Sequence, residues 1–244
     1  MTQVFLAGPA YEAVVPQALP GLMGASTKTP FAVVLKQSSI LPHTFNSLYC
    51  DCVNSGGYTH FAMHHADVEA PPGWLDTLLE ELEASGADVL SAVVPIKDYR
   101  GLTSTGLLNP NRREVRRLTM VEAATLPETF RASDLGHLGS PAWPLAVNTG
   151  LWVARLDAMR DARFPGFSID SGIEYGDGGE AISWFFPEDW KFAEWAFDEG
   201  LDVAATRKVA VVHHGRAEFR NDKVWGKWPT DLTYLEAMKR DAKD

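Results

Sequence analysis

A regular alternation of short apolar runs with helical patterns limits the folds open to this chain. Between the runs lie a helical pattern interrupted by prolines, a helix that we expect over residues 39–53, and a helix over residues 74–85 whose leucines share one face. One strand and one helix together take roughly 25–30 residues, which is typical of a parallel, doubly wound sheet. The runs that we expect to be buried strands cover residues 4–7, 31–35, 59–63 and 89–95.

The second half of the sequence is less regular. No repeat and no linker separates two units, so we expect a single domain over residues 1–244. The expected fold class is α/β, with a mostly parallel central sheet flanked by helices. The further elements expected are a strand over residues 150–156, an acidic, glycine-rich loop over 168–180, a helix over 187–199, and short strands over 203–205 and 209–212.

Composition excludes several classes of protein. Hydrophobic residues make up 45% of the chain and charged residues 22%, which indicates a packed domain rather than a disordered one. The formal net charge of −10 gives no overall attraction to nucleic acid or to an anionic membrane, so either partner would need a local basic patch. The sequence has no basic leader and no run of about 18 apolar residues, and we therefore expect a soluble, cytoplasmic protein without a membrane partner.

Three polar motifs carry the chemistry of the sequence. The first, residues 59–69, is an apolar strand that ends in polar residues and can present a carboxylate to a divalent cation that bridges to a diphosphate. The second, Glu188-Asp189, opens a helix, where a carboxylate either caps the helix or acts as a general base toward a hydroxyl. The third, His213-His214, ends a strand, so its side chains point to opposite faces and at most one joins a shared site.

The order and spacing of these motifs resemble those of the GT-A glycosyltransferases, over most of the chain. In that family a strand ends in a DxD motif, and an NTG-like strand, an acidic helix start and a late metal-binding histidine follow. The helix sequence PGWLDTLLEEL and the sequence GADVLSAVVPIK after it are also similar. The matching segments here are His65-Ala66-Asp67, Asn148-Thr149-Gly150, Glu188-Asp189 and His213.

The resemblance implies a GT-A, Rossmann-like fold in which about residues 1–97 bind a nucleotide sugar and about residues 98–244 bind the acceptor and carry catalysis. It implies a metal-dependent enzyme, similar to small bacterial and phage members, that moves a sugar from a UDP- or GDP-sugar to an acceptor hydroxyl. The implied setting is the cytosol of a bacterium or of a phage-infected host. The implied divalent cation is Mn²⁺ or Mg²⁺.

The resemblance also implies roles for individual residues. The catalytic residues would be Asp189, as general base, and Glu188. The cation would be held by Asp67 and His213, with Glu69 or His214 as substitutes. The nucleotide sugar would be bound by Pro9, Ala10, Tyr11, Gln37, Ser39, Asn46, His65, Ala66, Asp67 and Lys97. The acceptor would be bound by Asn148, Thr149, Gly150, Trp225 and Trp228.

The sequence departs from the family pattern at two positions. His65 stands where the DxD motif has its first aspartate; its imidazole can bind the ribose or a metal, but Asp67 is then the only acidic ligand of that pair. Phe45-Asn46 stands where small bacterial and phage members often have Arg-Asn, so the arginine of a phosphate or base contact is missing.

Basic residues gather in two segments of this acidic chain. Residues 109–118 contain four arginines, which form either a solvated surface or a nucleic-acid contact, and residues 213–229 interleave basic side chains with Trp225 and Trp228. By resemblance, small phage members glycosylate hydroxymethylated bases in DNA, so DNA is one candidate acceptor beside a sugar, a small molecule, a lipid or a protein. The four arginines are Arg112, Arg113, Arg116 and Arg117.

Three other functions stay open at this point. A nucleotidyltransferase would share the layered fold, but usually has a glycine-rich, basic loop after its first strand, where this chain has AGPAYE. A metal hydrolase could be built from His64, His65, Asp67 and His213. A carbohydrate-binding protein could have kept the fold and lost catalysis, since the first DxD aspartate is absent.

Overall fold

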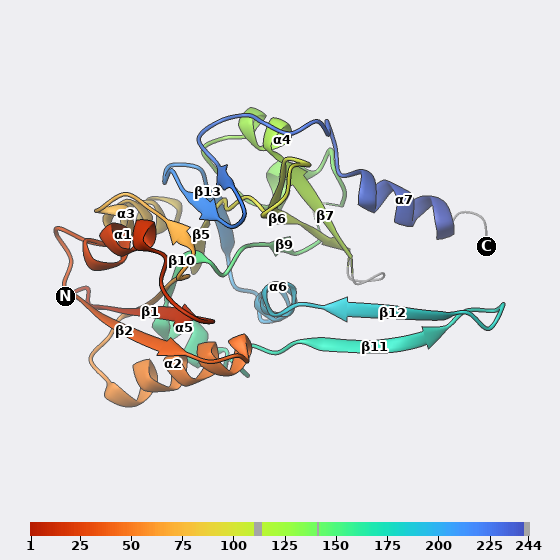
Figure 1. Cartoon of the computed structure of the whole chain (residues 1–244). Coiled ribbons are helices and arrows are strands. Elements are labelled where there is room, and N and C mark those ends of the chain that lie inside the picture. The colour runs from red at the N-terminus through yellow and green to blue at the C-terminus, as the bar shows by residue number, and fades with distance from the viewer. Residues whose placement is uncertain (110–113, 141, 242–244) are drawn as a thin grey trace.

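A seven-stranded sheet forms the centre of the molecule in the computed structural model, which describes residues 1–109, 114–140 and 142–241 (Figure 1). The strands are β1 Val4–Ala10, β2 Phe31–Gln37, β3 His60–His64, β5 Val89–Ala92, β8 Thr129–Phe130, β10 Leu151–Arg155 and β13 Val203–Thr206. They lie in the order β2-β1-β3-β10-β5-β13-β8, and only β10 and β8 run against the others. The expected α/β fold with a mostly parallel central sheet is confirmed.

The sheet differs from a purely parallel one at its middle. The expected strand over residues 150–156 is present as β10, but it lies antiparallel between β3 and β5. Its chain therefore enters the sheet at the edge where β3 and β5 end, and the segment Asn148–Gly150 lies beside the end of β3: the Gly150 carbonyl accepts a hydrogen bond from the His65 N–H at 2.7 Å.

Helices cover both faces of the central sheet. Figure 1 shows α1 and α3 on one face and α2 and α5 on the other, and each pair packs its apolar side chains into its own core. The leucines of α3 pack into the core that α3 shares with α1. Gly86 follows the last residue of this helix, and its φ of 71° is a value that glycine adopts without strain. The helices are α1 Leu19–Met23, α2 Leu41–Ser55, α3 Trp74–Ser85, α4 Met120–Thr125, α5 Leu156–Asp161, α6 Glu188–Asp198 and α7 Leu232–Asp241, with short 3₁₀ turns η1 Pro16–Ala18 and η2 Ala132–Leu135.

Smaller sheets and a hairpin complete the fold. One sheet joins β6 Leu102–Asn109, β7 Glu114–Thr119 and β9 Leu145–Ala146, and another joins β4 Val68–Glu69, β14 Val212–His214 and β15 Glu218–Arg220. The short strand expected over residues 209–212 was placed too early, because β14 begins at Val212 and includes both histidines. No helix among the described residues has the length and apolar character needed to cross a membrane.

The acidic loop expected over residues 168–180 is wrong. Its residues form β11 Asp170–Tyr175 and the turn into β12 Ala181–Phe186, an antiparallel hairpin. The acidic residues and glycines suggested a loop, but Asp170, Gly172 and Glu174 lie within β11, and the others form the turn, where the Gly176 N–H donates to the Glu180 carbonyl at 3.0 Å. Apolar residues still occur often enough on both sides of that turn to form strands.

Candidate functional site

Two motifs far apart in the sequence meet at the carboxyl edge of the central strands. Asp67 follows the end of β3, and β14 pairs antiparallel with β4, which places His213 opposite Val68. The His214 N–H donates to the Asp67 carbonyl at 2.9 Å. In open α/β sheets this edge is where ligands usually bind.

The Asp67 carboxylate is the centre of a small charged cluster. Its Oδ2 lies 2.5 Å from the Lys97 Nζ and 3.5 Å from the His213 Nε2. Burial opposes ionisation of this carboxyl group, but the neighbouring His213 ring and the Lys97 ammonium outweigh burial, so the pKa of Asp67 lies well below its ordinary range. Asp67 is therefore a carboxylate at any physiological pH.

The paired histidines separate as the strand pattern predicts. The His213 Nδ1 donates to the Pro95 carbonyl at 2.7 Å, which turns its Nε2 toward Asp67. His214 instead bonds the Glu69 Oε2 through its Nε2, also at 2.7 Å. The prediction that only one histidine joins the Asp67 site is confirmed, and Glu69 with His214 forms a separate pair.

The two histidines after β3 have different surroundings. His64 is 1% exposed, its Nε2 bonds the Val68 carbonyl at 2.6 Å, and burial lowers its pKa to about 4, so it stabilises the turn as a neutral side chain. The His65 ring packs on Phe45 at 5.1 Å between ring centroids, and burial lowers its pKa to about 4 as well. Its Nε2 is buried without a hydrogen-bond partner among the described residues. Such an atom is rare in a protein unless a ligand or water completes it.

A cavity of about 230 Å³ opens beside this histidine. It lies between the end of β1 and the Asp67 motif, and the two are tied together by the Ala66 N–H, which donates to the Pro9 carbonyl at 3.3 Å. Ala10 is 7% exposed and does not line it. The residues that line it are Pro9, Tyr11, Glu12, Ala13, Leu41, His65, Ala66 and Asp67. Five residues expected to bind the nucleotide sugar therefore surround one cavity.

Three other residues expected at the donor lie apart from that cavity. Gln37 pairs with Ala10 in the ladder between β2 and β1 and is exposed, as is Ser39. The structure gives Asn46 a different partner: its Nδ2 donates to the Phe167 carbonyl at 2.8 Å, and its Oδ1 accepts from the Phe167 N–H at 2.6 Å. Both ends of this amide thus hold the chain before β11.

The segment Asn148–Gly150, which we expected to bind the acceptor, is hydrogen-bonded to the chain beside Asp67 through the Gly150 carbonyl and the His65 N–H. The Asn148 Oδ1 accepts from the Gly150 N–H at 2.5 Å, and the Asn148 carbonyl accepts from the Ser91 hydroxyl at 2.7 Å. Thr149 is only 2% exposed. The acceptor contact expected at Thr149 stays a prediction, and its side chain is buried in this structure.

A second titratable cluster lies at the start of α6. The Asp189 Oδ1 accepts from the neighbouring Trp190 N–H at 2.9 Å, while Pro187 occupies the N-cap. Burial and then the Glu188 carboxylate raise the pKa of Asp189 to about 7, against the Arg117 guanidinium, which lowers it. Burial also raises the pKa of Glu188. A carboxyl group with a pKa near 7 suits proton transfer at neutral pH.

Arg117 joins this cluster to the loop that carries Lys97. Its guanidinium carbon lies 5.2 Å from the centre of the Trp190 ring, and it interacts electrostatically with Asp98 and Arg100. Arg100 in turn lies 5.4 Å over the ring of Trp228. The Asp189 cluster and the Asp67 cluster are thus both connected to residues 97–101.

The basic segment expected to face solvent is largely built into the fold. The side chain of Arg116 is 6% exposed and pairs with Glu122 at 2.5 Å. Arg117 is half-buried against Trp190, and the remaining two, Arg112 and Arg113, lie outside the described residues. A solvated face is therefore wrong for Arg116, whose charge is satisfied by Glu122. The tail tryptophan Trp225 also has an internal partner, since its Nε1 donates to the Arg220 carbonyl at 2.5 Å.

Asp67 and His213 are the residues of this site that could hold a divalent cation, together with a substrate. The bond from His213 to Pro95 orients a ring nitrogen toward the carboxylate, as in metal sites. No group of three or more His, Cys, Asp or Glu side chains comes together in the described ranges. Mg²⁺ is usually held by one or two carboxylates together with waters and substrate phosphates, and here Asp67 would supply the carboxylate and His213 an imidazole nitrogen. Lys97, which now pairs with Asp67, would then face those phosphates.

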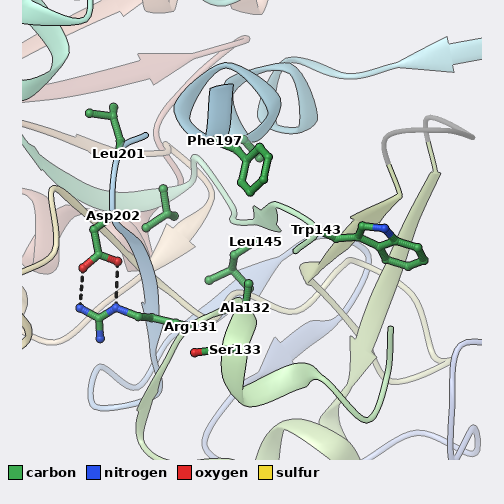
Figure 2. Close-up of a pocket in the computed structure, with 10 residues that line it drawn as sticks. Arg131, Ala132, Ser133, Trp143, Leu145, Phe197, Leu201 and Asp202 are labelled. Atoms are coloured by element: carbon green, nitrogen blue, oxygen red, sulfur yellow. Dashed lines mark hydrogen bonds and ion pairs between the residues drawn. The ribbon is translucent and has the colours of Figure 1, made fainter. Parts of the chain in front are cut away.

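Another cavity, of about 220 Å³, lies at the opposite edge of the sheet (Figure 2). Leu145, Ala132 and Phe197 give it an apolar lining, and Arg131 and Asp202 at its rim pair with each other. Asp202 precedes β13, so this cavity is at the amino-terminal edge of the parallel strands. Because its charged groups satisfy one another, it offers a ligand little beyond apolar contact.

No family model matches this sequence, and no curated protein matches it. Among solved structures, the chain is similar to A197 from STIV, with 12% identity and a TM-score of 0.56 over 93% of this chain and 95% of A197. It is also similar to S. aureus TarS 1-349, with 12% identity and a TM-score of 0.47 over 85% of this chain, and it spans 58% of that TarS chain. The likeness to A197 shows a shared fold alone.

Proposed function

We propose that this protein is a glycosyltransferase that binds a nucleotide-sugar donor in the cavity beside β1 and transfers the sugar to an acceptor hydroxyl. The observation that carries the proposal is the meeting of three features at one edge of the sheet. These are the cavity, the His65 Nε2, which has no hydrogen-bond partner in the described part of the chain, and the cluster of Asp67, His213 and Lys97. The resemblance of the motifs to the GT-A family supports the same conclusion.

The donor would be bound by groups of different character. Pro9 and Tyr11 would border the base and ribose, and the His65 Nε2 would gain its missing hydrogen bond from the donor. Lys97 would contact the diphosphate. Asp67 and His213 would hold Mn²⁺ or Mg²⁺, which when bound offsets the negative charge that develops on the leaving diphosphate.

Asp189 would act as the general base. In transfer with inversion, the acceptor oxygen forms a bond to the anomeric carbon, the bond from that carbon to the diphosphate breaks, and the hydroxyl proton passes to the Asp189 carboxylate. A pKa of about 7 leaves a substantial fraction of this carboxyl group ionised at neutral pH. Arg117 favours that ionised form.

The acceptor and the cellular setting belong to the same proposal. A hydroxymethylated base in DNA stays a hypothesis, and the internal ion pair of Arg116 removes one of the cations on which it depended. A cytoplasmic location in a bacterium or a phage-infected cell also stays a prediction. The donor site can be tested without knowing the acceptor.

The test is a thermal-shift panel of UDP, GDP and their sugars, each with manganese or with excess chelator. At about 100 times its Kd, a ligand adds roughly 2.7 kcal/mol to the free energy of unfolding, which for a chain of this length corresponds to about 5–10 °C. Asp67→Ala should abolish the part that needs the cation. Glu69→Ala should keep it, because Glu69 pairs with His214 instead.

Two results would contradict the proposal at different steps. Equal stabilisation by a nucleotide in manganese and in chelator would show that the nucleotide binds without a cation. No stabilisation by any nucleotide or nucleotide sugar would remove the donor site itself.

A further inference from the structure

One face of the hairpin of β11 and β12 has no packing partner among the residues that the structure describes. In antiparallel strands, paired residues share a face, so Ile173, Tyr175 and Phe185 point to the same side, with Ser171, Ala181 and Ser183 between them. All six residues are exposed, and the three large ones are 64%, 76% and 57% exposed. We call this surface the outer hairpin face.

The opposite face of the hairpin is the one that attaches it to the protein. Trp184 and Phe186 lie there, and they pack with Trp190 against the small core around Leu108 and Ala193. Figure 1 shows the two strands running out from the region of α6, with the turn far from the central sheet. The hairpin is therefore anchored at its base, while its outer face stays open.

The hairpin also leaves its strand edges open. Within the described ranges, β11 and β12 pair only with each other. A two-stranded hairpin is marginally stable alone, and a free apolar strand edge is a template for pairing with another chain. These features favour a partner that adds a strand and covers apolar side chains.

The charge of the hairpin restricts the partner further. Residues 168–186 contain four acidic residues and no lysine or arginine. Asp170 pairs with Lys191, but Glu174, Asp177 and Glu180 have no ion pair among the described residues. Such a surface repels nucleic acid, and it also repels a second copy of a chain whose net charge is −10.

We propose that the hairpin is a docking arm for a basic, extended polypeptide segment. The segment would pair its backbone with a free strand edge, lay alternate apolar side chains on the outer hairpin face, and place lysines or arginines near the acidic turn. β12 leads through Pro187 into the helix start that carries Asp189, so the docked segment would lie on that side of the molecule. The proposal stands independently of the transferase function.

The experiment measures fluorescence anisotropy of labelled octapeptides with the whole protein at physiological salt. The probe alternates lysine and isoleucine, a second peptide alternates glutamate and isoleucine, and a third carries a central proline, which removes a backbone donor. We expect the lysine peptide to bind and the other two to bind at least about tenfold more weakly.

Matched variants locate the binding surface. Ile173→Ser should weaken binding of the lysine peptide by about tenfold or more, as expected for a central apolar contact. Ile40→Ser should leave it unchanged, because Ile40 is also 64% exposed but lies before α2. Glu180→Lys should reduce the ratio of the affinity for the lysine peptide to the affinity for the glutamate peptide.

Three results would overturn the proposal. Equal binding of the lysine and glutamate peptides would show that the charge of the partner does not matter. Unchanged binding of the lysine peptide by Ile173→Ser would show that the outer hairpin face is not the binding surface. A dimer in sedimentation equilibrium that Ile173→Ser dissociates would assign this face to a second copy of the chain instead.

Discussion

Replacing Asp189 by asparagine tests two properties of this carboxyl group separately: its effect on the free energy of unfolding, and its proposed role as general base in sugar transfer. The pKa of Asp189 is raised from an ordinary 3.8 to about 7, so the folded protein binds this proton more tightly than the unfolded chain does. Stability therefore falls as pH rises from about 4 to about 7, and the loss is complete above that range. Three pKa units correspond to about 4 kcal/mol in the free energy of unfolding.

Asparagine does not titrate and is almost the same size. We expect Asp189→Asn to be more stable than the wild type at pH 8, with an advantage that is about 2–3 kcal/mol larger there than at pH 5. If Asp189 is also the base, turnover should fall by about 10²–10⁴-fold in the same preparation, while donor binding persists.

The assay is urea unfolding of both proteins at pH 5 and pH 8, together with turnover at each pH. Asp198→Asn is the matched control, since Asp198 lies exposed at the end of the same helix and its replacement should show no such dependence on pH. A stability difference that is the same at both pH values would refute the buried, proton-binding carboxyl group. Normal turnover of Asp189→Asn would remove Asp189 from the mechanism.

Two further predictions concern side chains that hold the fold around the site. Asn46→Ala should lower the free energy of unfolding by about 1–3 kcal/mol, measured by urea unfolding, because both backbone groups of Phe167 lose their partner. Arg116→Ala should lower it by about 3–5 kcal/mol, because it leaves the half-buried Glu122 carboxylate unpaired. Arg216→Ala, at an exposed position, is the control for both and should change it by less than about 0.5 kcal/mol.

Local sequence patterns predicted most elements of the fold because their cause is local. The helix expected over residues 74–85 is α3, with the same bounds, since its leucine spacing and the glycine after it act within a few turns. The antiparallel entry of β10 between β3 and β5 could not be predicted in this way. The direction of β10 depends on the path of the chain through residues 97–148. The residues of β10 alone do not determine it.

The sequence predicted the residues of the candidate site whose chemical type suits one role. It did not predict residues whose role depends on a contact with a segment far away in the sequence. Asp67 and His213 were expected together from the order of family motifs, and they meet at 3.5 Å. Asn46 and Thr149 have side chains that suit ligand contacts equally well, but one holds the Phe167 backbone and the other is buried. Only the packing of the surrounding elements decides between these roles.

The tail of the chain packs against the loop that carries Lys97, a contact that its composition does not predict. Gly101, at a φ of 82°, lies so close to the tail that a Cβ there would be 2.5 Å from the Trp225 carbonyl oxygen. Gly226, at a φ of 91°, makes the reciprocal approach to the Arg100 carbonyl oxygen. The tail therefore packs directly against Arg100 and Gly101, in the loop that also carries Lys97. Lys97 reaches Asp67 from this same loop, so the tryptophan-rich tail packs beside the segment that carries the cation paired with Asp67.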